Sequence, residues 1–223
     1  AIEHHNGTNW QYFAATESVD NPNLIMYLNA SDTTSYPGTG TTWFDLTPNG
    51  NNGAINGATW NSSGYFDFDG SNDGVTTTLG HSELPVSSSW SCSCWINTDS
   101  YSSPTNVFGM EDGSSPYYGW SLYLSTSGRI YVMVNGNAAI GQYVVTTGNW
   151  NSVTITYDGS LLSFYVDGSF ISSSTISINT PSSDFKLGDL GIYNTYNGKI
   201  SKARVYDVTL TQAEITALYN EGR

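Results

Sequence analysis

Apolar and polar residues alternate along short segments of the chain, which is the pattern of strands half-buried in a sheet. Between these segments stand Asn-Gly and Asp-Gly dipeptides, which favour the tight turns of β-hairpins. Short strands punctuated in this way predict an all-β fold, either a sandwich or a barrel. The expected strands are residues 24–28, 65–68, 90–96, 120–124, 130–134, 143–145, 153–157, 162–166 and 200–206.

One helix is predicted near the end of the sequence. Thr211 and Glu214 have the spacing of a capping box, and Gly222 follows where a helix usually ends. Ile215 and Leu218 lie three apart and share one helix face, which we expect to contact the sheets.

Residues 1–22 form a polar, turn-prone segment that we interpret as an N-terminal arm or linker, and residues 23–223 as the domain. Trp10, Tyr12 and Phe13 are too apolar for a free tail, so the arm is expected to contact the sandwich or a neighbouring subunit. His4 and His5 have no evident third metal ligand and are expected on a solvated surface.

Composition and charge exclude several classes of partner. The 223 residues carry a net charge of -13, with six Lys and Arg residues and none of them before Arg129. Nucleic acids and anionic lipids require clustered cations, so neither is expected as a partner. No run of about 18 apolar residues exists, so membrane insertion is not expected. Cys92 and Cys94 are two apart on one strand face and are expected as reduced thiols in the core.

Several ordered motifs resemble the laminin G-like, concanavalin A-like jelly-roll family. They lie at residues 42–53, 65–75, 90–96, 150–159, 164–168, 197–206 and 209–215, so the resemblance covers about residues 24–223. Pro48 and Gly74 depart from the family pattern. The resemblance implies a two-sheet antiparallel jelly-roll sandwich with a short C-terminal helix, in a laminin G-like domain over residues 23–223.

Residues 3–10, 24–28 and 35–43 resemble versions of this domain in virion proteins of marine tailed phages. This implies a non-enzymatic protein at the virion surface or outside the cell, for capsid decoration or host recognition. Its partners would be other virion proteins or further copies of itself in a homo-oligomer. A carbohydrate-binding module of a secreted bacterial protein is the alternative, followed by a glycoside hydrolase of this fold.

Catalytic patterns are missing from the sequence. Related hydrolases carry carboxylates as E-x-D-x-E on one strand, because retaining hydrolysis needs two of them about 5–5.5 Å apart. No two glutamates here lie at i and i+4 within one predicted strand, and Glu111-Asp112 is interpreted as a solvated turn. No G-x-S-x-G elbow accompanies His81, so we expect no enzyme.

Carbohydrate binding is predicted at aromatic residues in polar loops, where rings stack on sugar faces. These are expected to be exposed and to line one rim, and host-surface glycans are the candidate ligands. The predicted residues are Tyr117, Tyr118, Tyr193 and Tyr196.

Calcium is the candidate cofactor. Asp69, Asn72 and Asp73 lie in one acidic turn, and the neighbouring loop adds Asp45 and Asn51. Calcium prefers six to eight oxygen ligands, and domains of the resembled family often hold a calcium ion at their rim. An ordinary hairpin turn is the competing interpretation, and the sequence leaves both open.

Overall fold

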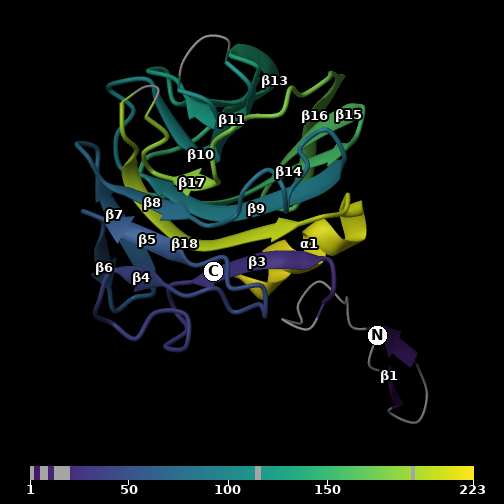
Figure 1. Cartoon of the computed structure of the whole chain (residues 1–223), viewed down its shortest axis with the longest axis horizontal. Coiled ribbons are helices and arrows are strands. Elements are labelled where there is room, and N and C mark those ends of the chain that lie inside the picture. The colour runs from purple at the N-terminus through teal and green to yellow at the C-terminus, as the bar shows by residue number, and fades with distance from the viewer. Residues whose placement is uncertain (1–2, 6–9, 13–20, 114–116, 192–193) are drawn as a thin grey trace.

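The computed structural model describes residues 3–5, 10–12, 21–113, 117–191 and 194–223, and it shows two antiparallel sheets facing each other (Figure 1). One sheet, called the upper sheet because its strands β10, β11 and β13 lie at the top of Figure 1, has the strand order β13-β12-β11-β10-β17-β8-β5-β4. Its strands are β4 (Thr42–Trp43), β5 (Gly53–Asn56), β8 (Gly74–Thr77), β10 (Thr105–Glu111), β11 (Gly119–Leu124), β12 (Arg129–Val134), β13 (Asn137–Val144) and β17 (Lys186–Leu187).

The lower sheet has the order β16-β15-β14-β9-β18-β7-β6, and β3 pairs with β18 beside it. Its strands are β3 (Leu24–Asn29), β6 (Thr59–Asn61), β7 (Tyr65–Asp69), β9 (Ser89–Thr98), β14 (Trp150–Asp158), β15 (Leu161–Val166), β16 (Ser169–Thr175) and β18 (Asn197–Tyr206). The expected all-β, two-sheet antiparallel fold is therefore confirmed.

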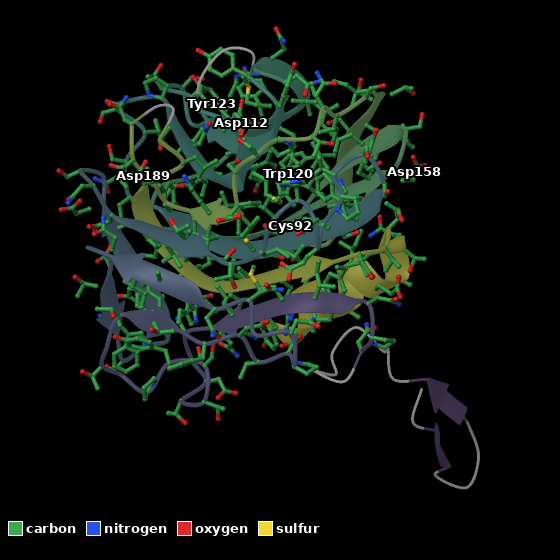
Figure 2. The ribbon with its side chains drawn as sticks, in the orientation of Figure 1. Cys92, Asp112, Trp120, Tyr123, Asp158 and Asp189 are labelled. Atoms are coloured by element: carbon green, nitrogen blue, oxygen red, sulfur yellow. The ribbon has the colours of Figure 1, made fainter. Side chains whose placement is uncertain are left out.

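The core fills the space between the two inner faces. Trp90 of β9 and Trp120 of β11 stack across it, with ring centroids 4.3 Å apart and 17° between the planes. Cys92 and Cys94 are buried free thiols on the same inner face as Trp90, as predicted from their spacing. Figure 2 shows Trp120 and Cys92 between the sheets. Removing such large rings from water is the main source of stability in a sandwich.

Two hairpins form where the sequence has its turn dipeptides. Asn135 and Gly136 join β12 to β13 with φ angles of 49° and 76°, and Asp167 and Gly168 join β15 to β16 with 50° and 73°. Two successive positive φ values are what a type I′ turn requires, and Asn, Asp and Gly tolerate them best. These turns set the register of the strands that follow.

Helix α1 (Gln212–Glu221) begins with the predicted capping box between Thr211 and Glu214 and ends at Gly222. Ile215 and Leu218 are buried in a small cluster with Leu24, Tyr206 and Leu210. In Figure 1 the helix lies below β18 and β9, on the side of the lower sheet that faces away from the upper sheet. Among the described residues, no helix has the length and apolar character needed to cross a membrane.

The N-terminal segment contains a small hairpin that its polar, turn-prone sequence did not predict. Strands β1 (Glu3–His5) and β2 (Trp10–Tyr12) pair with each other in a two-stranded sheet of their own. The sheets of the sandwich begin at β3.

Candidate functional site

The outer face of the upper sheet carries a pair of tyrosines. Along β11, Trp120, Leu122 and Leu124 point into the core, so Ser121 and Tyr123 point outward. Tyr123 lies directly opposite Tyr131 of β12, and their ring centroids are 6.3 Å apart. Figure 2 shows Tyr123 on the side of this sheet away from Cys92. Both side chains are partly exposed, so the face presents aromatic surface.

Two further tyrosines stand at one end of this sheet. Tyr117 and Tyr118 immediately precede β11, with 41% and 36% of their surface exposed. Tyr117 contacts the β12–β13 turn, since a Cβ on Gly136 would come within 2.9 Å of the Tyr117 side chain. The prediction that Tyr117 and Tyr118 are exposed is therefore confirmed.

Backbone hydrogen bonds fix the loops around this end of the sheet. Gly119 N donates to Asn179 O (2.8 Å), and Asn135 N donates to Gly119 O (2.9 Å). Asn179 N donates to the side-chain oxygen of Asn135 at 3.0 Å. Three segments distant in sequence are thus joined beside the exposed tyrosines, and they bring amide side chains to the rim.

Glu111 is buried at this end of the sheet, with 3% of its surface exposed. Its carboxylate accepts hydrogen bonds from Ser121 Oγ (2.6 Å) and Asn106 Nδ2 (3.4 Å), and one from the backbone N–H of Gly136. Burial raises the pKa of Glu111, and these hydrogen bonds oppose part of that rise. The carboxylate joins β10, β11 and the β12–β13 turn.

The interpretation of Glu111 as part of a solvated turn is wrong. Strand β10 continues through Glu111, which pairs with Gly119 of β11. The adjacent Asp112 does stabilise a loop: its Oδ1 accepts bonds from Ser182 N (2.8 Å), Ser182 Oγ (3.0 Å) and Ser183 N (3.1 Å). Both carboxylates are engaged in holding strands and loops together.

The expected single rim of four tyrosines is not formed. Tyr193 lies outside the described residues, and Tyr196 is fully buried rather than exposed. The Tyr196 hydroxyl lies 3.1 Å from Thr98 Oγ1, and its ring packs near Phe68 of the core. Burial raises the pKa of the Tyr196 phenol. Residue 196 directly precedes β18, and its side chain lies inside the sandwich.

The strand register also shows that the segment containing Tyr196 lies far along the sheet from Tyr117 and Tyr118. Asn194 bridges to Thr105 at the start of β10, and Thr105 pairs with Leu124 at the end of β11. Tyr117 and Tyr118 stand at the opposite ends of these strands, beside Glu111 and Gly119. The segment around residues 194–196 and the exposed pair therefore lie at opposite ends of the sheet.

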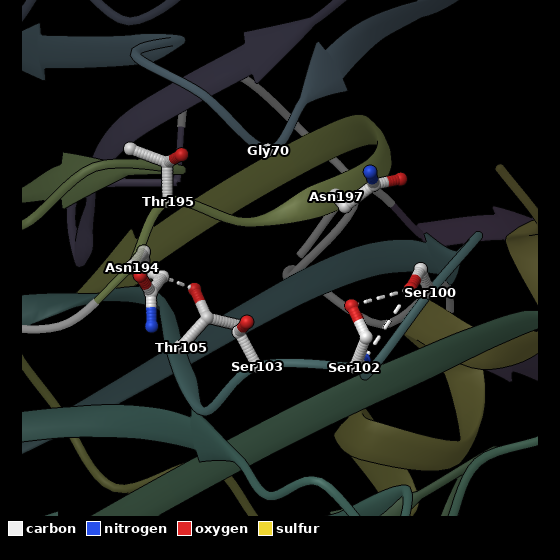
Figure 3. Close-up of a pocket in the computed structure, with 8 residues that line it drawn as sticks. All are labelled: Gly70, Ser100, Ser102, Ser103, Thr105, Asn194, Thr195 and Asn197. Carbon is white, nitrogen blue, oxygen red and sulfur yellow. Dashed lines mark hydrogen bonds between the residues drawn. The ribbon is translucent and has the colours of Figure 1, made fainter.

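A polar hollow of about 90 Å³ occurs beside Asn194 (Figure 3). Thr105 Oγ1 donates to Asn194 O at 2.5 Å, and Ser100 Oγ donates to Ser102 Oγ at 3.2 Å. The hydroxyl of Thr195 is buried without a partner. The hollow has room for a small hydrogen-bonding group, and its lining residues are Gly70, Ser100, Ser102, Ser103, Thr105, Asn194, Thr195 and Asn197.

Asp45 holds a turn together. Its Oδ1 accepts from Tyr27 N (2.8 Å) and Thr47 N (3.0 Å), and its Oδ2 accepts from Asn51 N (2.8 Å) and Thr47 Oγ1 (2.7 Å). The side chain of Asn51 donates to Ile25 O at 2.9 Å. Protein donors thus surround the Asp45 carboxylate and bind the loop to β3.

The acidic turn after β7 is organised in a similar way. Asp73 is buried and accepts from Asp69 N at 2.9 Å, and Asp69 Oδ1 accepts from Ser71 N at 2.8 Å. Burial raises the pKa of Asp73 despite the bond from Asp69 N. The carbonyl of Asn72 accepts from Asn56 Nδ2 at 3.0 Å. These hydrogen bonds are those of an ordinary turn, which was the alternative to a calcium site in the interpretation of the sequence.

The five predicted calcium ligands do not form one set. In the β5–β8 pairing, Asn56 lies opposite Gly74 and Gly53 lies opposite Thr77. Asp73 is therefore at one end of β5 and Asn51 at the other. Within the residues that the structure describes, no group of three or more His, Cys, Asp or Glu could hold a metal ion. Calcium binding stays an untested prediction.

Comparison with solved structures places the fold near two kinds of protein. A Trypanosoma rangeli sialidase mutant with trans-sialidase activity matches with a TM-score of 0.74 and 15% identity, over 91% of this chain and 33% of that chain. The same sialidase in complex with sialic acid gives a TM-score of 0.73 and 15% identity, over 91% and 33%. The botulinum neurotoxin type G receptor-binding domain gives 0.64 and 18%, over 89% and 51%.

These likenesses establish the fold alone, because the identities are low. The chain spans about a third of the sialidases it matches and half of the neurotoxin domain. The fold is thus shared by enzymes and by binding domains. No curated protein matches the sequence.

The predicted role as a virion surface protein is wrong. Solved structures that share its fold include sialidases and neurotoxin binding domains, and at 14–18% identity they support the fold and no role in a virion. The similarity to phage proteins rested on the composition of loops, which does not carry a function. What the sequence motifs do establish is family membership. The profile of the concanavalin A-like lectin and glucanase superfamily matches residues 68–216, and the chain belongs to this superfamily.

Proposed function

We propose that this chain is a non-catalytic carbohydrate-binding domain that binds its ligand on the outer face of the upper sheet. The observation that carries the proposal is the outward-facing pair Tyr123 and Tyr131, with exposed Tyr117 and Tyr118 at one end of the same sheet. Aromatic rings provide apolar surface for the C–H faces of sugar rings.

Polar groups beside Tyr117, in and around the β12–β13 turn that it contacts, support a ligand rich in hydroxyls. Asn137 is exposed in the strand that follows the turn, and Asn135 and Asn179 are fixed in the adjoining loops. Amides can donate and accept hydrogen bonds at once, as sugar hydroxyls also do. The pKa of Glu111 is raised by burial and its carboxylate is hydrogen-bonded to protein, so its part in binding is to position the rim.

The state of the carboxylates supports binding without hydrolysis. Retaining hydrolysis needs a nucleophile and an acid about 5–5.5 Å apart, both facing the substrate. Glu111 is buried, and Asp112 Oδ1 is occupied by the loop at residues 182–183. Neither carboxylate presents itself to the open face. The binding domains among the structural neighbours are compatible with this role.

A glycan array followed by product analysis tests the proposal. The full chain, labelled and applied at high concentration, should bind a limited set of glycans. The best glycan, incubated with excess protein and analysed by mass spectrometry, should be recovered intact. A blank array would contradict the binding role. Cleaved glycan that persists in a fresh preparation and is lost in Glu111→Gln would contradict the non-catalytic one.

A further inference from the structure

The lower sheet carries an aromatic corner that already holds a cation. The rings of Tyr65 and Trp150 have centroids 5.8 Å apart and planes inclined by 59°. The guanidinium carbon of Arg223 lies 4.4 Å from the centroid of the Trp150 ring and 5.9 Å from that of Tyr65. The two rings therefore bound a space in which a flat cation fits.

The contacts of Arg223 show what this corner recognises. Its Nη1 donates to the carbonyl of Ser63 at 3.3 Å. In the described part of the chain, the ion pairs are formed by Lys199, Lys202 and Arg204, and Arg223 is in none of them. The guanidinium is thus held by ring faces and one backbone oxygen, without a carboxylate. Arginine suits such a site because its plane can stack on a ring while its N–H groups donate at the edge.

The charge around the corner also favours a cation. Phe66 and Phe68 of β7 point into the core, so Tyr65 and Asp67 share the outer face. Lys199 lies opposite Asp67, but its ammonium is paired with Asp99. The whole chain carries a net charge of -13, which attracts basic partners over a distance.

We propose that Tyr65 and Trp150 form a binding site for an arginine side chain of a partner protein, and that Arg223 is its resident occupant. A partner's arginine gains the same ring faces and the Ser63 carbonyl when it displaces Arg223. The resident side chain competes as a tethered group at a millimolar effective concentration, so it weakens binding until a partner offers further contacts. The site lies on the lower sheet, so it is independent of the proposed carbohydrate face.

Titration of the full chain with N-acetyl-arginine amide tests the proposal. The probe is added to ¹⁵N-labelled wild type and to Arg223→Ala, and the indole N–H signal of Trp150 is followed, assigned by its loss in Trp150→Phe. Arg223→Ala should reach half-saturation at a probe concentration at least tenfold below that of wild type. Arg129→Ala, which removes an exposed arginine elsewhere, should behave as wild type does.

Two further experiments distinguish recognition of the positive charge from binding that depends on shape alone. N-acetyl-citrulline amide has nearly the same shape without the charge, and it should cause no saturable shift. Tyr65→Leu in the Arg223→Ala background should weaken binding of the arginine probe, with an unchanged melting temperature showing that the fold is intact. Equal titrations of wild type and Arg223→Ala would overturn the proposal. Equal responses to arginine and citrulline probes would also overturn it.

Discussion

Ser121 Oγ donates a hydrogen bond of 2.6 Å to the buried carboxylate of Glu111, joining β11 to the end of β10 where Tyr117 and Tyr118 are exposed. Gly109, directly opposite Ser121 in the ladder, has no side chain to fill the space beside that hydroxyl. A Cβ on Gly109 would come within 2.6 Å of Ser121 Cα. The Glu111 side chain can therefore bend back along its strand to reach both Ser121 and Asn106.

We expect Glu111→Ala to lower the free energy of unfolding by about 1–3 kcal/mol, because the hydroxyl of Ser121 and the N–H of Gly136 lose their acceptor. Urea denaturation at neutral pH measures this loss. Glu111→Gln keeps an acceptor and should cost less. An unchanged midpoint in Glu111→Ala would show that the carboxylate does not hold the rim.

The raised pKa of Glu111 also predicts that the stability of the fold depends on pH. Burial raises its pKa above that of the unfolded chain, so its ionisation costs more in the folded state. Its contribution to stability is fully present below the unfolded pKa of about 4.3 and is lost as pH rises through the folded pKa. Compared with wild type, Glu111→Gln should lose less stability between about pH 4.3 and neutral pH. Parallel stability curves would contradict the raised pKa.

The pKa of Glu221 is shifted in the opposite direction to that of Glu111. Burial raises its pKa, but Arg204 and Lys202 outweigh burial and hold it below the usual range. Arg204 Nη2 donates to both carboxylate oxygens, at 2.6 and 2.7 Å, and Lys202 Nζ donates at 3.0 Å. This stabilising contribution is present above the unfolded pKa of about 4.3 and is lost as pH falls through the folded pKa.

Glu221→Gln should lower the free energy of unfolding by about 1.5–3 kcal/mol at neutral pH, because the buried Arg204 loses hydrogen bonds to a charged acceptor. It should also lack the loss of stability that wild type shows below about pH 4.3. Thermal melts across this pH range provide the measurement, and Asp184→Asn, at an exposed position, serves as the control. Equal melting temperatures of Glu221→Gln and Asp184→Asn at every pH would contradict this prediction.

A substitution of Asp45 tests whether its carboxylate stabilises the loop by hydrogen bonds or by binding calcium. Asp45→Ala leaves the N–H groups of Tyr27 and Asn51 without their acceptor, so we expect about 1–3 kcal/mol of destabilisation for each group that stays buried. Urea denaturation in calcium and in chelator should give the same loss, since protein donors surround this carboxylate. A loss seen only with calcium present would contradict that role.

Removal of residues 1–20 tests the interpretation of the N-terminal arm. Strands β1 and β2 pair with each other, and the sheets of the sandwich begin at β3. The truncated chain should therefore keep the melting temperature of the full chain. Sedimentation of both chains tests the expected self-association through the arm, and equal masses would argue against it.

The fold was largely predictable because its strands and turns have strong local patterns. Trp120 and Leu122 alternate with polar residues, and Asn135-Gly136 supplies the φ angles of its turn. Strand β10 was missed because all its residues are buried, so alternation is lost. Its Gly109 and Glu111 also resemble loop residues when read in isolation.

The site was less predictable because it depends on which segments meet. Tyr117 and Tyr196 lie in similar polar sequences, yet Tyr117 is exposed and Tyr196 is buried. The difference arises from their strands: Tyr196 leads into the central strand β18, whereas Tyr117 precedes β11 at the rim. Tyr123 and Tyr131 did alternate with core residues, and that signal could have identified the outer face.

The affinity of tyrosine variants for the glycan selected on the array tests the central claim most directly. Tyr131→Ala should weaken binding in isothermal titration calorimetry by about 1–3 kcal/mol, as loss of other aromatic stacking contacts does. Phe170→Ala, which removes an exposed aromatic ring from the lower sheet, should bind as wild type does. Equal affinities for wild type and Tyr131→Ala, or a loss confined to Phe170→Ala, would contradict binding on the outer face of the upper sheet.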